Sequence, residues 1–234
     1  MNKMIEQQLE DKQKNPKHIG IVLDGNRRFA KRLMLQPWKG HELGYEKIEK
    51  LFDWCKELGI KQLTLYVFSV KNFNRPKKEF DYLMKLFEDA FIRAKDDDRL
   101  KDIKINFIGR IHMFSVAVQR AMKELMEKTK DNKGHTINFA MAYGGKEEII
   151  DSVKKLVESG KKINKENLGD CMYMNEDVDL VIRTSGEKRT SDFLPWQAHY
   201  AEWIFLDKMW PDFEKQDLID CIQDFNNRNR RFGV

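Results

Sequence analysis

Residues 18–28 of the chain read HIGIVLDGNRR, and this stretch decides the class of fold. Its first six residues are mostly aliphatic and β-branched, which predicts a buried strand over 18–23. The polar turn Asp24-Gly25 ends that strand, and a helix is expected to follow at once and to run through 29–32. A strand that leads directly into a helix is typical of βαβ units.

The same alternation continues along the chain. Stretches with helical period, such as 42–58 and 77–96, lie between further strands expected at 62–68, 104–108, 136–141, 178–182 and 203–206. Strands alternating with helices predict an α/β fold: a single domain with a central, mostly parallel six-stranded sheet flanked by helices on both faces. We expect a polar N-terminal leader at 1–17 and this one domain at 18–234.

Composition excludes several other classes of protein. Apolar residues make up 41% of the chain, and 15 Phe, 6 Tyr and 5 Trp are too many aromatic side chains for a disordered one. The longest apolar runs, such as 63–68, are far shorter than the roughly 20 residues of a membrane span. The N-terminus lacks the apolar core of a signal peptide, and three widely spaced cysteines suit reduced thiols, so a cytoplasmic location is expected. The net charge of +5 suits an anionic partner without naming one.

Ligands of parallel α/β sheets bind outside the carboxyl ends of the strands. The residues that follow the expected strands are rich in Gly, Asn, Ser and Arg: DGNRR at 24–28, SVKNFNRP at 69–76, GR at 109–110, YGG at 143–145 and RTSGEKRTS at 183–191. Glycine admits a ligand close to the backbone, and the polar side chains donate hydrogen bonds to phosphate oxygens. The pattern predicts a phosphate-binding rim with one well-placed acid, Asp24.

The segment Asp24–Arg28 has the clearest pattern of the five. Gly25 allows a tight turn, and the start of the next helix offers free N–H groups to an anion. Two arginines in a first helical turn oppose the helix dipole, a cost that a bridging anion offsets. Asp24 could hold a divalent cation against that anion. The alternative interpretation is an ordinary helix start with two solvated arginines.

Two more loops and one histidine are candidates, each with a plainer alternative. Arg183 and Arg189, with Ser191 close by, resemble a clamp for a diphosphate, or else they belong to a solvated basic loop. The loop at 69–76 is either a binding loop or a polar turn. His41 is either a proton shuttle or a capping histidine.

Glu202, the helical stripes and an acidic run also allow two interpretations. Glu202 lies among apolar residues, where a carboxylate needs an arginine or a metal as its partner. The apolar stripes over 77–96 and 115–128 are ordinary core, or they line a channel for an apolar ligand. The run Asp96-Asp97-Asp98 stands at an expected helix end among lysines, so we interpret it as a solvated terminus and not as a metal site.

The sequence resembles the cis-prenyltransferases, the undecaprenyl (polyprenyl) diphosphate synthase family. The resemblance rests on blocks that keep one order from about residue 18 to the C-terminus: HIGIVLDGNRRFAK, GHELGYEKI, LTLYVFSVKNFNRP, FAMAYGG, DLVIRTSGEKRTSDFLPWQAHYAEWIF, WPDF and NRNRRFG. The DGNRR form is more similar to archaeal or eukaryotic-type members than to the bacterial DGNGRW form. The resemblance implies the cis-prenyltransferase fold and makes 18–234 the catalytic domain.

The resemblance also implies an activity. The implied activity is Mg²⁺-dependent transfer of prenyl groups, in which isopentenyl diphosphate is added repeatedly to an allylic diphosphate, farnesyl or geranylgeranyl diphosphate. The implied product is a long polyprenyl diphosphate, the precursor of a glycosyl carrier lipid. Carried over by position, the catalytic residues would be Asp24, Asn72, His41 and Arg75, and the metal ligands Asp24 and Glu202. Gly25, Asn26, Arg27, Arg28, Ser69 and Phe73 would bind the allylic substrate, and Arg183, Arg189, Ser191, Arg231 and Gly233 would bind isopentenyl diphosphate.

The family resemblance further implies a homodimer, in which the RxG element of Arg231 and Gly233 reaches the partner's site. An apolar product needs a dry channel, which favours the channel interpretation for Phe80, Leu83, Phe87, Phe91 and the adjoining Val67. Release of such a product is expected to involve loose contact with a membrane surface.

The chain departs from the family at Lys71, where bacterial members carry Glu, at Gln36-Pro37-Trp38, at Ala142 and at Lys188. These departures leave the primer, the product length and the acceptor open. Two other functions would keep the fold: transfer to a non-isopentenyl acceptor such as an alcohol, or a non-catalytic partner subunit. The retained Asp24 and clamp arginines argue against a non-catalytic subunit. Nucleic-acid binding is disfavoured because the basic residues gather at one strand-end rim.

Overall fold

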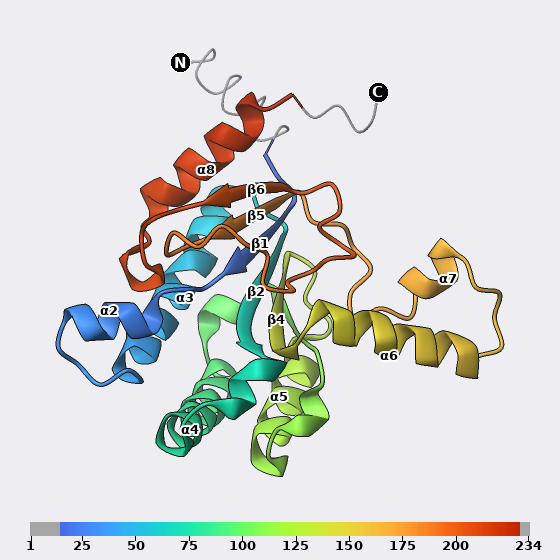
Figure 1. Cartoon of the computed structure of the whole chain (residues 1–234), viewed down its shortest axis with the longest axis horizontal. Coiled ribbons are helices and arrows are strands. Elements are labelled where there is room, and N and C mark those ends of the chain that lie inside the picture. The colour runs from blue at the N-terminus through green and yellow to red at the C-terminus, as the bar shows by residue number, and fades with distance from the viewer. Residues whose placement is uncertain (1–14, 230–234) are drawn as a thin grey trace.

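The structure is a computed structural model that describes residues 15–229, built around one six-stranded sheet (Figure 1). The strands are β1 (His18–Val22), β2 (Gln62–Ser69), β3 (Ile103–Ile108), β4 (His135–Tyr143), β5 (Leu180–Arg183) and β6 (Glu202–Phe205). They lie in the order β3-β4-β2-β1-β5-β6, and every neighbouring pair is parallel. The α/β class and the six-stranded parallel sheet expected from the sequence are confirmed.

Helices and short 3-10 turns connect the strands. The α-helices are α2 (Asn26–Arg32), α3 (Lys39–Glu57), α4 (Lys77–Ala94), α5 (Val116–Thr129), α6 (Gly145–Glu158), α7 (Lys165–Gly169) and α8 (Lys215–Asn227). The 3-10 turns are η1 (Val70–Asn74), η2 (Asp98–Leu100), η3 (Ile111–Met113) and η4 (Trp210–Asp212). No helix within 15–229 is long and apolar enough to cross a membrane.

The sheet separates two apolar cores. In β1, Ile19 and Ile21 belong to the larger core, together with residues of α3, α4, α5 and α8, whereas Val22 belongs to a second core with Phe193 and Leu194. All five residues of β1 are buried, as expected of a central strand covered on both faces. Gly20 leaves room for the Phe193 ring, because an added Cβ would lie 3.1 Å from it.

The loop after β1 occupies the point where the topology reverses. The chain passes from β1 to β2 on one side, and only later returns to place β5 on the other side of β1. Crossover connections therefore leave the two sides of β1 in opposite directions, which opens a crevice at its carboxyl end. Asp24 and the start of α2 stand at that crevice.

The acidic run after α4 is the solvated terminus that the sequence predicts. Asp96 and Asp98 are exposed and pair with Lys128 and Lys101 at 3.1 and 2.9 Å. Asp97 differs, because it caps η2 and pairs with the guanidinium of Arg99. Of the expected leader at 1–17, residues 1–14 lie outside the described residues.

Candidate active site

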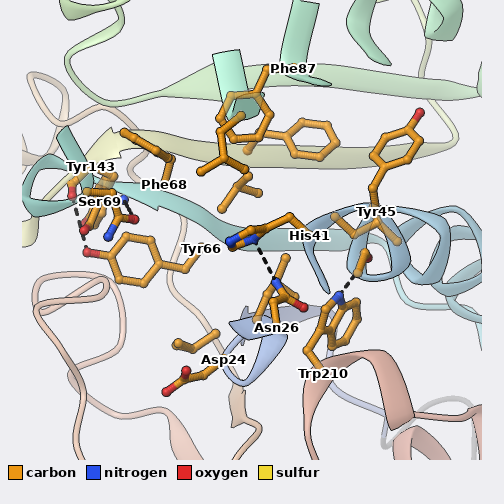
Figure 2. Close-up of a pocket in the computed structure, with 18 of the residues that line it drawn as sticks. Asp24, Asn26, His41, Tyr45, Tyr66, Phe68, Ser69, Phe87, Tyr143 and Trp210 are labelled. Atoms are coloured by element: carbon orange, nitrogen blue, oxygen red, sulfur yellow. Dashed lines mark hydrogen bonds between the residues drawn. The ribbon is translucent and has the colours of Figure 1, made fainter. Parts of the chain in front are cut away.

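A cavity of about 720 Å³ opens at the carboxyl ends of the central strands (Figure 2). One end of it is polar, and most of the predicted site residues lie there: Asp24, Asn26, His41, Ser69, Asn72, Arg75, Arg183, Arg189 and Ser191. The other end is apolar and runs between the sheet, α3, α4 and α5. The structure therefore unites segments that are up to 167 residues apart in the chain, Asp24 and Ser191 being the two extremes.

Asp24 is held in place from both its backbone and its side chain. Its carbonyl oxygen accepts hydrogen bonds from the Thr184 hydroxyl at 2.7 Å and from the Trp210 amide at 3.0 Å. Its Oδ2 accepts from Nη2 of Arg183 at 2.9 Å. Gly25 makes the turn with a φ of 109°, and a Cβ there would meet Met209 at 3.0 Å, so only glycine fits without strain.

Arg183 is the buried cation of the rim. It is only 3% exposed, and Nη1 donates to Ser191 Oγ at 2.7 Å and to the backbone oxygen of Arg189. These bonds fold the loop 183–191 back on itself, as a clamp requires. Arg189 itself is largely exposed and pairs with Glu187.

Three buried polar atoms of this rim lack a partner among the described residues: Nε of Arg183, Oγ of Ser185 and Oδ1 of Asn26. Buried polar groups are nearly always hydrogen-bonded, so the unpaired Nε of Arg183, whose Nη2 binds Asp24, is a donor that a polar ligand would satisfy. Oδ1 of Asn26 instead faces Gly44, where an added Cβ would lie 2.5 Å from it.

The two arginines after Gly25 have partners within the protein. Arg28 lies 3.6 Å from Asp24 and 3.4 Å from Glu187, and Arg27 lies 3.8 Å from Glu79. Both arginines are about half exposed and form no close hydrogen bond in these pairs. They stand on the rim beside the cavity, available to an anion that enters it.

His41 belongs to a buried cluster whose centre is Glu79, a residue that the sequence did not single out. Glu79 is 3% exposed and accepts from Arg75, while its Oε1 lies 3.3 Å from His41 Nε2. The hydrogen bond with His41 and the charge of Arg75 lower the pKa of Glu79 to about 2. Burial lowers the pKa of His41, so this imidazole is neutral near pH 7. A Glu at the third position of a helix is an ordinary helix-start residue, which is why its other role was not visible in the sequence.

The loop at 69–76 is an ordered turn over the cavity. The amide of Ser69 donates to Oδ1 of Asn72 at 3.0 Å, which closes η1. Ser69, Lys71, Asn72 and Arg75 line the cavity. Phe73 does not, because it packs against Phe68, Phe80 and Phe114. Direct contact between Phe73 and a ligand in this cavity is therefore not supported.

The apolar end of the cavity corresponds to the predicted channel. Val67, Leu83, Phe87 and Phe91 line it, as expected, but Phe80 lies behind Phe68 and Phe73. Leu86, Ala90 and Leu125, from the predicted stripes over 77–96 and 115–128, also line it. Further walls that the sequence did not propose for the channel are Ile48, Phe52, Leu100, Ile105 and Phe139. Figure 2 shows Phe68 and Phe87 on the opposite side of the cavity from Asp24.

Glu202 is not brought to Asp24 within one chain. Glu202 is the first residue of β6 and pairs with Leu180 of β5. Leu180 precedes Arg183 by three residues, which is about 10 Å along the strand. Its carboxylate accepts from Arg228 at 2.8 Å. An arginine is one of the two partners that the sequence allowed for this carboxylate, and the metal-ligand role stays a prediction. Arg231 and Gly233 lie outside the described residues.

The rim fits a magnesium ion only in combination with a ligand. No group of three or more His, Cys, Asp or Glu side chains within 15–229 could hold a metal by itself. Magnesium, however, is commonly bound by one or two carboxylates together with substrate phosphates and water. Asp24 supplies one such carboxylate at the rim.

The fold and the site together define a class of protein: one that binds a phosphorylated head at a basic rim and a long apolar chain in the cavity below it. The family model described as putative undecaprenyl diphosphate synthase matches residues 22–233. The chain belongs to this prenyltransferase family, as the sequence motifs indicated.

Individual relatives agree with the family assignment. A tritrans,polycis-undecaprenyl-diphosphate synthase (geranylgeranyl-diphosphate specific) of Methanopyrus kandleri is 41% identical over 99% of this chain and 90% of its own length. An isoprenyl transferase of Thermus thermophilus is 42% identical over 93% of this chain and 89% of its own. The crystal structure of lavandulyl diphosphate synthase from Lavandula x intermedia, in complex with dimethylallyl diphosphate, has a TM-score of 0.89 and 33% identity over 95% of this chain and 100% of its own.

Proposed function

We propose that the chain is a cis-polyprenyl diphosphate synthase that condenses isopentenyl diphosphate onto an allylic diphosphate to make a long polyprenyl diphosphate. One observation carries the proposal: a rim of Asp24, Arg183 and Ser191 closes one end of a cavity whose other end is apolar. Such a cavity matches an amphiphile with an anionic head and a hydrocarbon chain. The named activities of the archaeal relatives support the same function.

In the proposed reaction the allylic carbon–oxygen bond breaks, a carbon–carbon bond forms to isopentenyl diphosphate, and a proton is lost. The departing diphosphate gains charge as it leaves, so donors aimed at it lower the barrier. Asn26, Arg27 and Arg28 are assigned to that diphosphate, and Arg183, Arg189 and Ser191 to isopentenyl diphosphate. The turn at 69–76 lines the same cavity and would align the substrates, with Asn72 assisting removal of the proton.

Magnesium is part of the proposal, with Asp24 as its protein ligand. The ion would neutralise charge on the leaving diphosphate. Asp24 can turn toward such an ion because its carboxylate is 30% exposed while Arg183 is nearly buried. Glu79 keeps Arg75 and His41 oriented toward the cavity. A neutral His41 suits a hydrogen-bonding role beside Asn26, whose Nδ2 lies 3.5 Å from its Nδ1 (Figure 2).

A second copy of the chain is also part of the proposal. Ile150, Val153 and Val157 form an exposed apolar stripe on α6 that a partner subunit would cover. Sedimentation-equilibrium measurements should give twice the mass of 27.9 kDa. A monomer at micromolar concentration would contradict the homodimer without affecting the assignment of the reaction.

A product assay tests the proposed function. Purified protein is incubated with Mg²⁺, radiolabelled isopentenyl diphosphate and either farnesyl or geranylgeranyl diphosphate, with and without EDTA, and the extracts are resolved by chain length. We expect a ladder that ends in a long polyprenyl diphosphate and disappears with EDTA. Incorporation of no label with either primer would refute the synthase, and parallel tubes with an alcohol acceptor would then test the other prenyl transfer.

A further inference from the structure

The loop between α2 and α3 carries an apolar tip formed by Leu33, Met34 and Leu35. Met34 is 94% exposed, and Leu33 and Leu35 are 46% and 44% exposed. Three successive large apolar side chains thus face solvent at one edge of the molecule, where this loop projects beyond the sheet (Figure 1). Scattered exposed apolar residues are common, but a contiguous group marks an interaction surface.

The backbone of Met34 is also strained. The equivalent position after α3 is occupied by glycine, the residue usually found there. At the end of α2 the amide of Met34 donates to the carbonyl oxygen of Lys31 at 3.0 Å, and the amide of Leu35 donates to that of Ala30 at 2.8 Å. The end of α3 has the same pattern of two hydrogen bonds, with Gly59 and Ile60 as the donors. The first residue of each pair is left-handed, with a φ of 56° at Met34 and 74° at Gly59. Glycine is preferred there because a Cβ is unfavourable. Met34 therefore has both an unfavourable backbone and an unfavourable exposure, and at 94% exposed it gains little packing against the rest of 15–229 to offset them.

The surroundings of the apolar tip are basic. Residues 26–39 contain five basic side chains and no acidic one: Arg27, Arg28, Lys31, Arg32 and Lys39. Lys31 forms no ion pair within 15–229. Arg32 and Lys39 pair with Asp212 and Glu42, but all four of these side chains remain partly exposed. An exposed apolar group with basic side chains around it is complementary to a lipid bilayer whose headgroups are anionic and whose interior is apolar.

The apolar tip lies close to the polar end of the cavity. α2 carries Asn26 and α3 carries His41, both of which line the cavity. The two helices touch, because a Cβ on Gly40 would lie 1.9 Å from the backbone oxygen of Asn26. The tip is thus joined rigidly, through less than three turns of helix, to the rim that would hold the diphosphate.

We propose that the apolar tip, Leu33 to Leu35, inserts into an anionic phospholipid bilayer while Lys31, Arg32 and Lys39 contact the headgroups. The inference deepens the proposed function, since an apolar product is then made at the surface that receives it. Binding to the bilayer needs no turnover, so it can be tested whether or not the chain is a synthase.

The test measures co-sedimentation of the full chain with vesicles of phosphatidylcholine alone and with vesicles containing about one-third phosphatidylglycerol. We expect binding to the anionic vesicles that weakens as salt is raised. The triple variant Leu33→Ser, Met34→Gly, Leu35→Ser should lower the partition coefficient about tenfold or more, since it removes the buried apolar area. Lys31→Gln should lower it about fivefold, as the loss of one charge near the surface predicts.

The matched control is Ile163→Ser. Ile163 is 73% exposed in the loop between α6 and α7, at the opposite edge of the molecule from the tip in Figure 1, and its loss should leave vesicle binding unchanged. Met34→Gly alone should raise the thermal midpoint of unfolding, because glycine adopts the left-handed backbone without strain. A variant that binds vesicles less but melts no earlier than the wild type has lost binding and not its fold. Activity on soluble substrates in detergent should stay within about twofold in every tip variant.

Three outcomes would overturn the proposal. One is equal binding of the wild type and the triple variant. Another is absence of binding to anionic vesicles. The third is a triple variant that changes the oligomeric mass and not the partition coefficient, which would make the tip a contact between two copies. Loss of activity in both wild type and variants, with vesicle binding intact, would instead contradict the proposed function alone.

Discussion

Asp24 and Arg183 form an unequal pair. The guanidinium of Arg183 is almost fully buried, whereas the carboxylate of Asp24 reaches the cavity. A buried guanidinium that loses its partner is strongly destabilising, so Asp24 has a structural role as well as its proposed metal-binding one. The amide of asparagine keeps a hydrogen bond to Arg183 and removes only the charge.

Asp24→Asn should therefore lower kcat by about a hundredfold or more, because the proposed metal loses its protein carboxylate. Steady-state kinetics with Mg²⁺ titration measures this loss, and circular dichroism monitors the fold. Asp81→Asn, which breaks the exposed pair with Lys77, serves as the control and should leave kcat within about twofold. Full activity in Asp24→Asn would contradict the metal role.

Glu79 gives the site a pH-dependent stability. Its pKa is lowered from 4.5 to about 2 in the folded chain, so folding favours the charged carboxylate. That stabilisation is complete above pH 4.5 and is lost as the pH falls from 4.5 to about 2.

Glu79→Gln should lower the free energy of unfolding at pH 7 by roughly 2 kcal/mol, and the difference from wild type should shrink below pH 4.5. Urea denaturation at pH 7, 4 and 3 measures this. Glu124→Gln removes an exposed carboxylate paired with Lys95 and should leave the free energy of unfolding at pH 7 unchanged within error. A difference for Glu79→Gln that stayed constant with pH would mean that lost packing, not lost charge, is responsible.

At the scale of elements, α4 lines the cavity along its length, from the polar end to the apolar end. Ala90 and Ala94 both line it and stand four residues apart, about 6 Å along the helix axis. Small side chains at these positions leave the apolar end open. The helix also carries Glu79 at its start, so one element bears both the polar cluster and the wall for an apolar chain.

Ala90→Leu should shorten the polyprenyl product, and Ala94→Leu should shorten it less if the chain grows from the rim toward the far end. Product chain length on thin-layer chromatography measures both. Overpacking by itself costs about 1–3 kcal/mol, and Ala121→Leu controls for it because Ala121 is buried in the same core but does not line the cavity. Equal shortening by all three variants would show that destabilisation, not filling of the channel, is responsible.

The whole molecule should be stabilised by its ligand. A diphosphate bound between β1, β2 and β5 joins segments distant in sequence, so it binds the folded chain and not the unfolded one. At a concentration of about 100 times Kd, farnesyl diphosphate with Mg²⁺ should raise Tm by roughly 5–10 °C. Differential scanning fluorimetry measures the shift, and EDTA should remove most of it. An equal shift with EDTA would show that binding does not need the metal.

Most of the fold follows from patterns local in the sequence. The ends of each predicted strand lie within about two residues of the observed ends. Short β-branched runs bounded by Gly, Asn or Ser strongly favour a strand over a helix or a loop. The largest differences are two residues each: β4 runs to Tyr143 and not to 141, and β5 begins at Leu180 and not at 178, since the amide of Val178 bonds instead to the backbone of Gln197. The rim at the strand ends was predictable for the same reason, since parallel strands bring their carboxyl ends to one edge.

What the sequence determined by itself is therefore the class of fold, the family and the polar residues that gather at the strand ends. Only the tertiary structure decided which side chains meet. Glu79 joins His41 and Arg75 because α3 and α4 pack together, and Glu202 lies away from Asp24 because the register of β5 and β6 puts it near the amino end of the sheet. The exposure of Met34 is likewise a tertiary property. The physical reason is that strand and helix patterns arise from neighbours in the chain, whereas contacts, register and exposure depend on how distant segments pack.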